Sequence, residues 1–297
     1  MTNNSEIRIP QSALPNIARL LISCADQKGI VAVLSNFIFE HGGNIIQSDQ
    51  HSTNYQNGQF FMRLEFSLEN FDLSPEEFGS NFQPIADRFH MYWQINYTNK
   101  IKRIGFFVSK EFHCLIDLLW RWKSGELSMD IPFLISNHSD AEKIANDFEI
   151  DFYHFPVNKN DKPEQENKVL DLIKGKADFL VLARYMQILS KNFIEHYQHK
   201  IINIHHSFLP AFAGAKPYQQ AQKRGVKIIG ATAHYATCEL DQGPIIEQDI
   251  IRVSHKDSLN ELQQKGHDIE RTVLARAVKW QIEDRIIVYK NKTIVFV

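Results

Sequence analysis

Apolar patterning changes near residue 100, and this change constrains the fold of the 297-residue chain more than any other feature. Before that point, the apolar periodicity predicts the order strand, helix, strand, strand, helix, strand. After it, strand-like runs alternate with helical runs. The first order is typical of a ferredoxin-like βαββαβ unit, and the second of a Rossmann-like, mostly parallel sheet covered by helices. We therefore expect an α/β protein with two domains, at residues 1–98 and 99–297.

Local signals define the elements of the first domain. Apolar residues from Ile30 to Ile38 recur at helical spacing, and His41-Gly42-Gly43 ends that helix. The turn signal Asn57-Gly58 precedes an apolar alternation from Phe60 to Leu68, which predicts a hairpin. Ser74 is the expected N-cap of a second helix, with a proline at its first position. The other strands are expected at 18–23, 45–53 and 92–96.

The second domain shows a regular alternation of strands and helices. Strands are expected at 104–108, 131–136, 151–155, 179–183 and 201–204. Helices are expected at 114–123, 141–148 and 164–174, and a long amphipathic helix at about 259–280. Strands at 286–289 and 293–297 are expected to form a closing hairpin. In such sheets ligands bind at the carboxyl ends of the strands, so functional side chains are sought where strands end.

Composition and charge exclude several classes of protein. Lys and Arg total 33 against 35 for Asp and Glu, a net charge of −2, and no basic run is long enough to follow a nucleic-acid backbone. No run of about 18 apolar residues is present, and the polar start, Met1–Pro10, does not resemble a secretory signal. Three widely spaced cysteines, Cys24, Cys114 and Cys238, fit a reducing compartment. We expect a cytoplasmic protein that binds neither nucleic acid nor membranes.

The stretch from Ile202 to Pro210 places two chemically useful side chains at the end of a strand. Asn203 and His205 are two residues apart, so strand geometry points both side chains to the same face. An amide donor and a titratable base would then face one cavity. A lone histidine in an α/β domain is more often structural, and the spacing alone leaves a structural and a catalytic role for His205 equally open.

A second stretch, Gly230–Ile246, combines a strand with a loop that carries Asp241. A carboxylate beside an imidazole orients the ring and raises its basicity, and it can also hold a water molecule. In isolation, an aspartate close to a glycine is usually a turn residue.

A metal site is the alternative for the histidines at 196, 199, 205 and 206. Their spacing lacks the cysteine or carboxylate of a zinc pattern, so we expect no metal.

Together these two stretches resemble the signatures of the folate-dependent formyltransferase family. Asn203-Ile204-His205 with Ser207-Phe208-Leu209-Pro210 is similar to the first signature. Thr232, His234 and the run Glu239–Ile246 are similar to the second, in the same order along the chain. The resemblance extends over about residues 102–281 and implies the mostly parallel sheet of that family.

The resemblance also implies roles for individual residues. Asn203, His205 and Asp241 would act on the formyl group of 10-formyltetrahydrofolate. The segment Ala183–Ser190 is similar to the part of the family whose backbone holds the pterin ring, and residues 236–240 would line the other side of that pocket. The substrate-binding residues implied in this way are Met186, Gln187, Ile188, Leu189, Ala236, Glu239 and Leu240.

One departure from the transferase pattern concerns the acceptor. The purine-pathway transferases of this family carry a glycine-rich loop after their first strand, which holds a phosphate of the acceptor. The corresponding stretch here, Val108–Leu115, has no glycine and contains an acidic residue. Backbone amides crowded by side chains make a poor phosphate cradle, which argues against a nucleotide acceptor.

The first domain resembles the ACT modules, which bind amino acids between paired copies. The resemblance covers about residues 16–96 and rests on the turn residues Asp26, Gly29, Gly43 and Asn44. It implies an amino-acid effector and a homo-oligomer such as a tetramer. Since glycine and methionine are the amino-acid readouts of one-carbon balance, in which 10-formyltetrahydrofolate takes part, we expect one or both of them as the effector. An ACT module followed by a formyltransferase-type domain without the phosphate loop is similar to the formyltetrahydrofolate deformylase family. The segments that also resemble that family are Ser109-Lys110, His113–Leu115 and Trp120–Leu127.

The activity that the resemblance implies is hydrolysis of 10-formyltetrahydrofolate to formate and tetrahydrofolate, without a cofactor. The reaction would supply formate for purine synthesis and balance the one-carbon pool. Asp241 and His205 would activate water, and Asn203 would stabilise the oxyanion. Two alternatives stay open: a formyltransferase that acts on an amine of a nucleotide, sugar or tRNA, and a non-catalytic sensor of folate and amino acids.

Overall fold

The computed structural model describes residues 16–54, 56–157, 161–211 and 217–297, which form two compact units. The first unit comprises the described residues up to Ile101 together with Glu283–Ile287 and Ile294–Val297. The second comprises Lys102–Ile282 and Val288–Thr293. The start of the chain, Met1–Pro10, for which we expect no secretory signal, lies outside the described residues.

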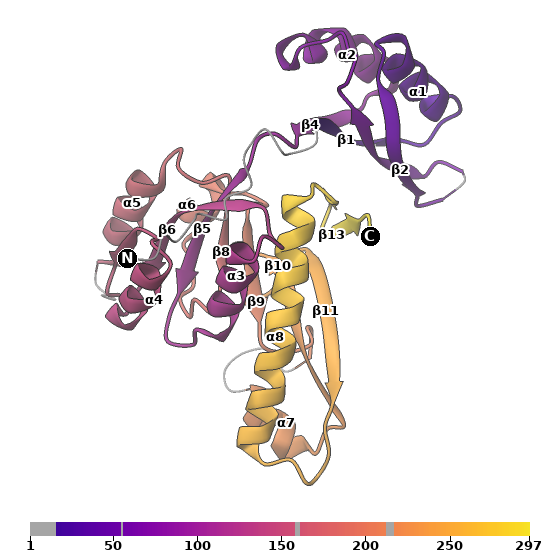
Figure 1. Ribbon diagram of the computed structural model, residues 1–297. Helices are drawn as coiled ribbons and strands as arrows, with labels where there is room; N and C mark the ends of the chain where they lie inside the picture. The colour runs from indigo at the N-terminus through magenta and orange to yellow at the C-terminus, as the bar shows by residue number, and fades with distance from the viewer. Residues whose placement is uncertain (1–15, 55, 158–160, 212–216) are drawn as a thin grey trace. The chain divides into compact units, whose positions relative to one another are not determined.

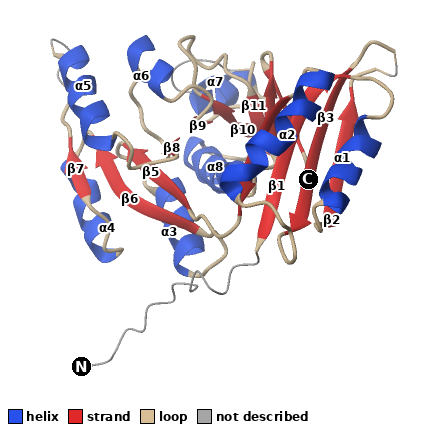
Figure 2. Ribbon diagram, turned by 90° about the horizontal axis from the view of Figure 1, so that it is seen from above, coloured by secondary structure: helices blue, strands red, loops and turns tan. Residues whose placement is uncertain are grey.

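A four-stranded antiparallel sheet in the order β2-β3-β1-β4 forms the first unit (Figure 1). Its elements are β1 (Ile17–Ala25), α1 (Ile30–Glu40), β2 (Asn44–Ser52), β3 (Gln59–Ser67), α2 (Pro75–Phe89) and β4 (Tyr92–Tyr97). Both helices lie on one face of the sheet (Figure 2). This is the ferredoxin-like βαββαβ arrangement, so that prediction is confirmed.

The sequence explains why α2 begins where it does. The Ser74 hydroxyl accepts a hydrogen bond from the amide of Glu77 at 3.3 Å, and the Glu77 carboxylate accepts one from the amide of Ser74 at 3.0 Å. This reciprocal capping box satisfies two amides that the helix itself cannot. Pro75 occupies the first helical position, where no amide hydrogen is needed.

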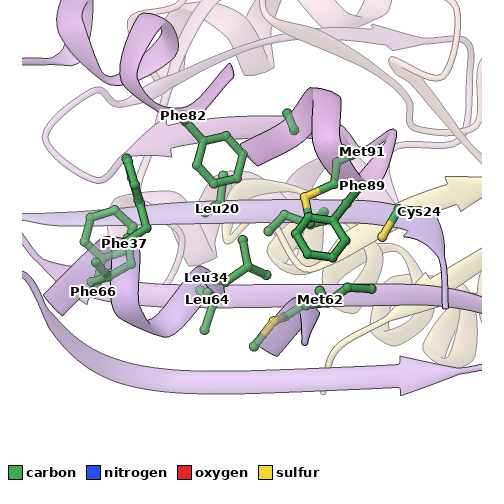
Figure 3. Close-up of a cluster of buried hydrophobic side chains, with 14 of the residues drawn as sticks. Leu20, Cys24, Leu34, Phe37, Met62, Leu64, Phe66, Phe82, Phe89 and Met91 are labelled. Atoms are coloured by element: carbon green, nitrogen blue, oxygen red, sulfur yellow. The ribbon is translucent and has the colours of Figure 1, made fainter. Parts of the chain in front are cut away.

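Alternate strand residues and one stripe of each helix form the core of the first unit. Leu20 on β1 and Met62 on β3 are buried together with Phe37 on α1 and Phe82 on α2 (Figure 3). The rings of Phe37 and Phe82 meet edge to face, with centroids 5.3 Å apart, an arrangement that aromatic pairs favour. The helices therefore bury the apolar face of the sheet, as the two-residue repeat of β3 predicts.

The opposite face of this sheet holds the end of the chain through Arg63. This side chain is fully buried on β3, and its Nε donates to the carbonyl oxygen of Asp284 at 2.9 Å. Its Nη2 donates to the carbonyl oxygen of Glu283 at 2.8 Å and to the carboxylate of Glu65. Residues 283–287 thus belong to the first unit, whereas the domain prediction places them with the second.

The second unit contains a seven-stranded sheet in the order β11-β10-β9-β8-β5-β6-β7 (Figure 1). The central strands run parallel, whereas β10 and β11 are antiparallel to their neighbours. The strands are β5 (Lys102–Val108), β6 (Met129–Ser136), β7 (Phe152–His154), β8 (Phe179–Leu182), β9 (Ile201–His205), β10 (Ile228–Tyr235) and β11 (Ile245–Arg252). The mostly parallel sheet expected for this part of the chain is confirmed.

Helices cover both faces of this sheet. They are α3 (His113–Lys123), α4 (Glu142–Asp147), α5 (Lys162–Ile173), α6 (Lys191–His196), α7 (Pro217–Arg224) and α8 (Leu259–Ile282). Helices α5 and α6 share a core cluster with β5, β6, β8 and β9, and α3 and α4 lie on the other face (Figure 2). Helix α8 packs against α3 and along β9, β10 and β11 (Figure 1).

Two short helices, α6 and α7, were not expected from the sequence. The predicted closing hairpin is confirmed as β12 (Ile286–Tyr289) and β13 (Lys292–Val295).

Among the described residues, none of the helices combines the length and the apolar character that crossing a membrane requires.

Candidate active site

The side chains of Asn203 and His205 project from the same face of β9, as their spacing predicts. β9 pairs with β10 in an antiparallel register that sets Asn203 opposite His234 and His205 opposite Thr232. Directly opposed residues of an antiparallel pair carry their side chains on one face of the sheet. Four polar side chains therefore gather on one face of β9 and β10.

Asp241 reaches this face from the loop between β10 and β11. Its Oδ1 lies 3.2 Å from Nδ1 of His205 and 3.8 Å from Nε2 of His234. The loop returns close to β10 because Gly243 has no side chain: a Cβ there would lie 1.7 Å from the carbonyl oxygen of Tyr235. Asp241 itself has a left-handed φ of 57°, which aspartate tolerates better than most residues. The glycine two residues after Asp241 thus permits the turn that delivers the carboxylate.

His205 and Asp241 form an oriented pair. A carboxylate only accepts hydrogen bonds, so we assign the proton that faces Asp241 to Nδ1 of His205. The hydrogen bond from His205 holds the pKa of Asp241 below its ordinary value, although burial opposes this shift. The other ring nitrogen of His205, Nε2, is buried without a hydrogen-bond partner among the described residues. Such an imidazole can take a proton from a bound water or give one to a leaving group.

His234 is part of the second family signature but was not predicted as a site residue, although the two-residue repeat of β10 sets it on the same face as Thr232. Its Nδ1 lies 3.0 Å from the carbonyl oxygen of Tyr235, so Nδ1 carries a proton. Burial lowers the pKa of His234, so the ring is neutral and its Nε2 accepts a hydrogen bond from the Asn203 amide, 3.2 Å away. This contact uses one N–H of Asn203 and leaves the second N–H available.

Thr232 fixes the loop that follows His205. Its hydroxyl donates to the carbonyl oxygen of Ser207 at 2.8 Å and accepts from the amide of Leu209 at 3.0 Å. The side-chain amide of Gln248 on β11 donates to the Thr232 hydroxyl and to the Leu209 carbonyl oxygen, each at 2.9 Å. Side chains from β10 and β11 therefore hold the segment Ser207–Leu209, which follows His205 in the chain.

The segment predicted to hold the pterin ring follows β8. Met186 and Ile188 are 56% and 59% exposed, Gln187 between them is half-buried, and Leu189 packs against the core. The Met186 amide donates to the Ser109 hydroxyl at 2.9 Å, which anchors the segment to the end of β5. Large exposed apolar side chains on an anchored backbone suit a flat, partly apolar ligand.

The segment predicted for the other side of that pocket follows β10. Leu240 is 57% exposed and Glu239 is also exposed, while Ala236 packs against the same core cluster as Leu189. The Thr237 hydroxyl donates to the carbonyl oxygen of Glu239 at 2.9 Å and fixes the turn. The two predicted substrate-binding segments thus start from one core cluster.

The four residues predicted for an amino-acid site lie at the two ends of α1. Asp26 and Gly29 precede the helix, and Gly29 has a left-handed φ of 94°. Gly43 and Asn44 follow it, and a Cβ on Gly43 would lie 2.7 Å from the side chain of Ile38. With 11 residues, α1 is roughly 16 Å long. One copy of the chain does not bring these four residues together, so an effector site made of them needs paired copies and stays a prediction.

Within the described residues, two groups of side chains bring possible metal ligands together: Glu111, His113 and His267, and His113, Cys114 and Glu270. The rings of His113 and His267 stack at 3.9 Å with 13° between their planes, so their in-plane lone pairs cannot converge on one ion. In the second group, burial raises the pKa of the Cys114 thiol and keeps it protonated, whereas metals bind the thiolate. Neither group has the geometry or the charge of a metal centre.

Comparison with known proteins identifies the family of this chain. Residues 102–278 match the family model described as formyl transferase. A formyltetrahydrofolate deformylase from Synechocystis sp. is 52% identical over 280 residues, which are 94% of this chain and 98% of that protein. The chain belongs to the formyltetrahydrofolate deformylase family. It is therefore an enzyme of that family.

Solved structures of deformylases match nearly the whole chain. One from Pseudomonas syringae matches with a TM-score of 0.92 at 48% identity, and the match covers 95% of both chains. A glycinamide ribonucleotide transformylase from Symbiobacterium toebii matches with a TM-score of 0.63 at 25% identity, covering 68% of this chain and 97% of that one. The deformylases thus account for a part of this chain that has no counterpart in the transformylase.

Proposed function

We propose that the chain hydrolyses 10-formyltetrahydrofolate to formate and tetrahydrofolate. The pair of His205 and Asp241 carries this proposal, because an ionised carboxylate orients an imidazole whose buried Nε2 has no partner among the described residues. A non-catalytic sensor of folate has no use for an oriented base of this kind. The relatives' own name, formyltetrahydrofolate deformylase, supports the same reaction.

Hydrolysis forms one bond and breaks one. A water oxygen attacks the formyl carbon while Nε2 of His205 takes one of its protons. The former carbonyl oxygen becomes an oxyanion and accepts a hydrogen bond from the second amide N–H of Asn203. The His205 imidazolium, stabilised by Asp241, gives its proton to N10, and the bond between carbon and N10 breaks. Tetrahydrofolate and formic acid leave, and the acid ionises to formate.

The side chains themselves supply a base, an acid and an oxyanion donor. A side-chain donor to an oxyanion lowers the barrier by about 2.7–4 kcal/mol. His234 holds the amide of Asn203 in place for this task. We therefore propose that hydrolysis requires neither a metal ion nor a cofactor.

Two segments are proposed to bind the folate part of the substrate. The exposed apolar side chains of Met186 and Ile188 lie on the segment after β8, with Gln187 between them. Leu240, with Glu239 beside it, directly precedes Asp241 on the other segment. Because Leu240 directly precedes Asp241, a folate whose pterin ring binds between these segments can bring N10, which carries the formyl group outside the ring, towards the carboxylate.

Water is the proposed acceptor because the first backbone amide after β5 is committed to an internal hydrogen bond. The Ser109 amide donates to the carbonyl oxygen of Arg184 at 3.2 Å, and the Ser109 hydroxyl donates to Oδ1 of Asn137 at 2.7 Å. A phosphate cradle at this position needs free backbone amides. The observation disfavours an acceptor that carries a phosphate.

Regulation and context follow from the first unit and from the composition. We propose that glycine or methionine binds between paired copies at Asp26, Gly29, Gly43 and Asn44, in a tetramer. The expected setting is the cytoplasm, where the reaction would supply formate for purine synthesis and balance the one-carbon pool. Light scattering of the full chain tests the tetramer. The effector site is tested by comparing the activity of the wild type with that of the Asp26→Asn and Asn44→Ala variants, with and without either amino acid. Retention of the wild-type response in both variants would remove the effector site.

The reaction is tested with the purified full chain, 10-formyltetrahydrofolate, EDTA and no amine. We expect formate and tetrahydrofolate to appear in equal amounts over many turnovers. The His205→Ala variant is expected to fold and to release no formate above background. Absence of formate with the wild-type chain, or its loss on adding EDTA alone, would overturn metal-free hydrolysis.

A further inference from the structure

Arg184 follows β8 in a backbone conformation that glycine normally takes. Its φ of 63° lies in the left-handed region, which disfavours residues with a Cβ. Ser109 holds this conformation from two sides: its amide donates to the carbonyl oxygen of Arg184 at 3.2 Å, and its hydroxyl accepts from the amide of Met186 at 2.9 Å. Because these hydrogen bonds fix the backbone of Arg184, its long side chain starts in a fixed direction.

The guanidinium of Arg184 is buried with spare hydrogen-bonding capacity. Arg184 is only 8% exposed, and its Nε and Nη1 are buried without a hydrogen-bond partner among the described residues. Glu270 provides an opposite charge, with Oε2 at 3.4 Å from Nε. The contact with Glu270 is made through Nε, whereas the edge of the guanidinium that carries Nη1 has no acceptor at Nη1 among the described residues. Burying a cation whose N–H groups have no acceptors costs folding free energy, and an anion bound to those groups offsets that cost.

Two donors besides Arg184 hold the Glu270 carboxylate in place. It is fully buried on α8, where Oε1 accepts from the Tyr218 hydroxyl and Oε2 accepts from Nε2 of His113 at 2.9 Å. Gly266 on the same helix makes room for Tyr218, since a Cβ there would lie 2.1 Å from its hydroxyl oxygen. Burial alone would raise the pKa of Glu270, but the hydrogen bond from His113 and the charge of Arg184 lower it to about 2. The carboxylate is thus fixed and ionised.

His206 connects this cluster to the catalytic pair. It follows His205 in the chain, with ring centroids 5.2 Å apart, and its ring lies 6.0 Å from that of Tyr218. Burial and the positive charge of Arg184 lower the pKa of His206 to about 4, and the same ring feels the charge of Asp241. A neutral imidazole therefore lies within electrostatic range of both the guanidinium and the catalytic carboxylate.

We propose that the free edge of the Arg184 guanidinium is a binding subsite for a small carboxylate, the formate that hydrolysis releases. This rests on the proposed function, which makes formate beside His205. A planar guanidinium and a carboxylate match in shape and charge, whereas the neutral formyl group of the substrate offers no such match. Arg184 therefore gains an interaction as the product forms, and formate binds to it without folate.

Binding of free formate to the full chain tests the subsite without any turnover. Sodium formate is titrated against sodium chloride at equal ionic strength, up to about 50 mM, well above a millimolar Kd. The thermal unfolding midpoint and the line width of ¹³C-formate report binding. We expect a saturable effect of formate, a weaker one of the bulkier acetate and none of chloride. Arg184→Gln is expected to abolish the effect, and Arg184→Lys to weaken binding at least tenfold, because a lysine loses the planar fork.

Arg121→Gln is the matched control, because Arg121 lies on α3 and is paired with Asp117 and Glu126. This variant is expected to bind formate like the wild type. If Arg184→Gln does not fold, Arg184→Lys alone decides. No saturable formate binding in the wild type, or equal binding in the Arg184 variants, overturns the subsite even when hydrolysis is normal. Arg184-dependent binding in a chain that releases no formate from the folate supports the subsite and overturns the proposed hydrolysis instead.

Discussion

Asp241 Oδ1 lies 3.2 Å from Nδ1 of His205, and Nε2 on the far side of the same ring is buried without a hydrogen-bond partner among the described residues. The carboxylate fixes both the tautomer and the direction of the imidazole. The two residues are 36 positions apart in the chain, and the loop that joins β10 to β11 brings them together. The proposed chemistry of the site depends on this contact.

Replacement of Asp241 by asparagine keeps the shape of the side chain and removes its charge. We expect kcat to fall by about 10²–10⁴, because His205 loses its orientation and the stabilisation of its protonated form. The KM for the folate is expected to change little. Asp249→Asn, a change at a surface position of β11 paired with Arg276, serves as the control and should retain activity. A kcat for Asp241→Asn within a few-fold of wild type contradicts the assigned role.

The hydrogen bond between Asn203 and His234 predicts coupled losses. Asn203→Ala should lower kcat by about 10²–10³ by removing the oxyanion donor. His234→Ala should lower kcat less, because the amide remains but loses its orientation. In the double variant the loss should equal that of Asn203→Ala alone, since the role proposed for His234 is to orient the Asn203 amide. Multiplicative losses in this cycle would show that the two residues act separately.

His206 predicts a dependence of stability on pH. Its folded-state pKa of about 4 lies below the ordinary value of 6.5. Between these values the unfolded chain binds a proton that the folded chain does not, so stability falls as the pH falls, by up to about 1.4 kcal/mol per pH unit. His206→Gln removes this contribution and should flatten the pH dependence by that amount in urea unfolding experiments. An unchanged slope in the variant would mean that His206 is protonated in the folded protein.

Glu270 predicts a large structural effect at neutral pH. Its folded-state pKa of about 2 lies below the ordinary 4.5, so its contribution is complete above pH 4.5 and is lost as the pH falls towards 2. Glu270→Gln leaves Arg184 without its buried counter-charge and His113 without its carboxylate acceptor, and it should cost about 3–5 kcal/mol of unfolding free energy at pH 7.

Glu195→Gln is the control for this experiment. Its exposed ion pair with Lys191 predicts a change of about 0.5 kcal/mol or less. The difference between wild type and Glu270→Gln should shrink below pH 4.5. A difference at pH 7 no larger than that of the control contradicts the buried ion pair.

Local patterns predicted most of the fold because they act over a few residues. The two-residue repeat of β3 and the capping box at Ser74 each specify one element without reference to the rest of the chain. Helix α7 escaped prediction because only Tyr218 and Ala221 form its apolar face beyond its first proline. Such a short helix is stabilised by packing, which periodicity cannot detect.

The site was predictable to the extent that neighbours in sequence share a face. Asn203 and His205 follow from strand geometry alone. The contact of Asp241 with His205 required the resemblance to a family, since no local rule states where a loop returns. The cluster of Arg184 and Glu270 joins residues far apart in the chain, among them His113, which lies 157 positions before Glu270. No sequence signal pointed to it.

Oxygen labelling tests directly whether water is the acceptor at His205 and Asp241. The full chain is given 10-formyltetrahydrofolate in H₂¹⁸O together with an added primary amine, and the products are analysed by mass spectrometry. We expect formate that contains ¹⁸O and no formylated amine. A formylated amine without labelled formate would show a transferase and overturn the proposed hydrolysis.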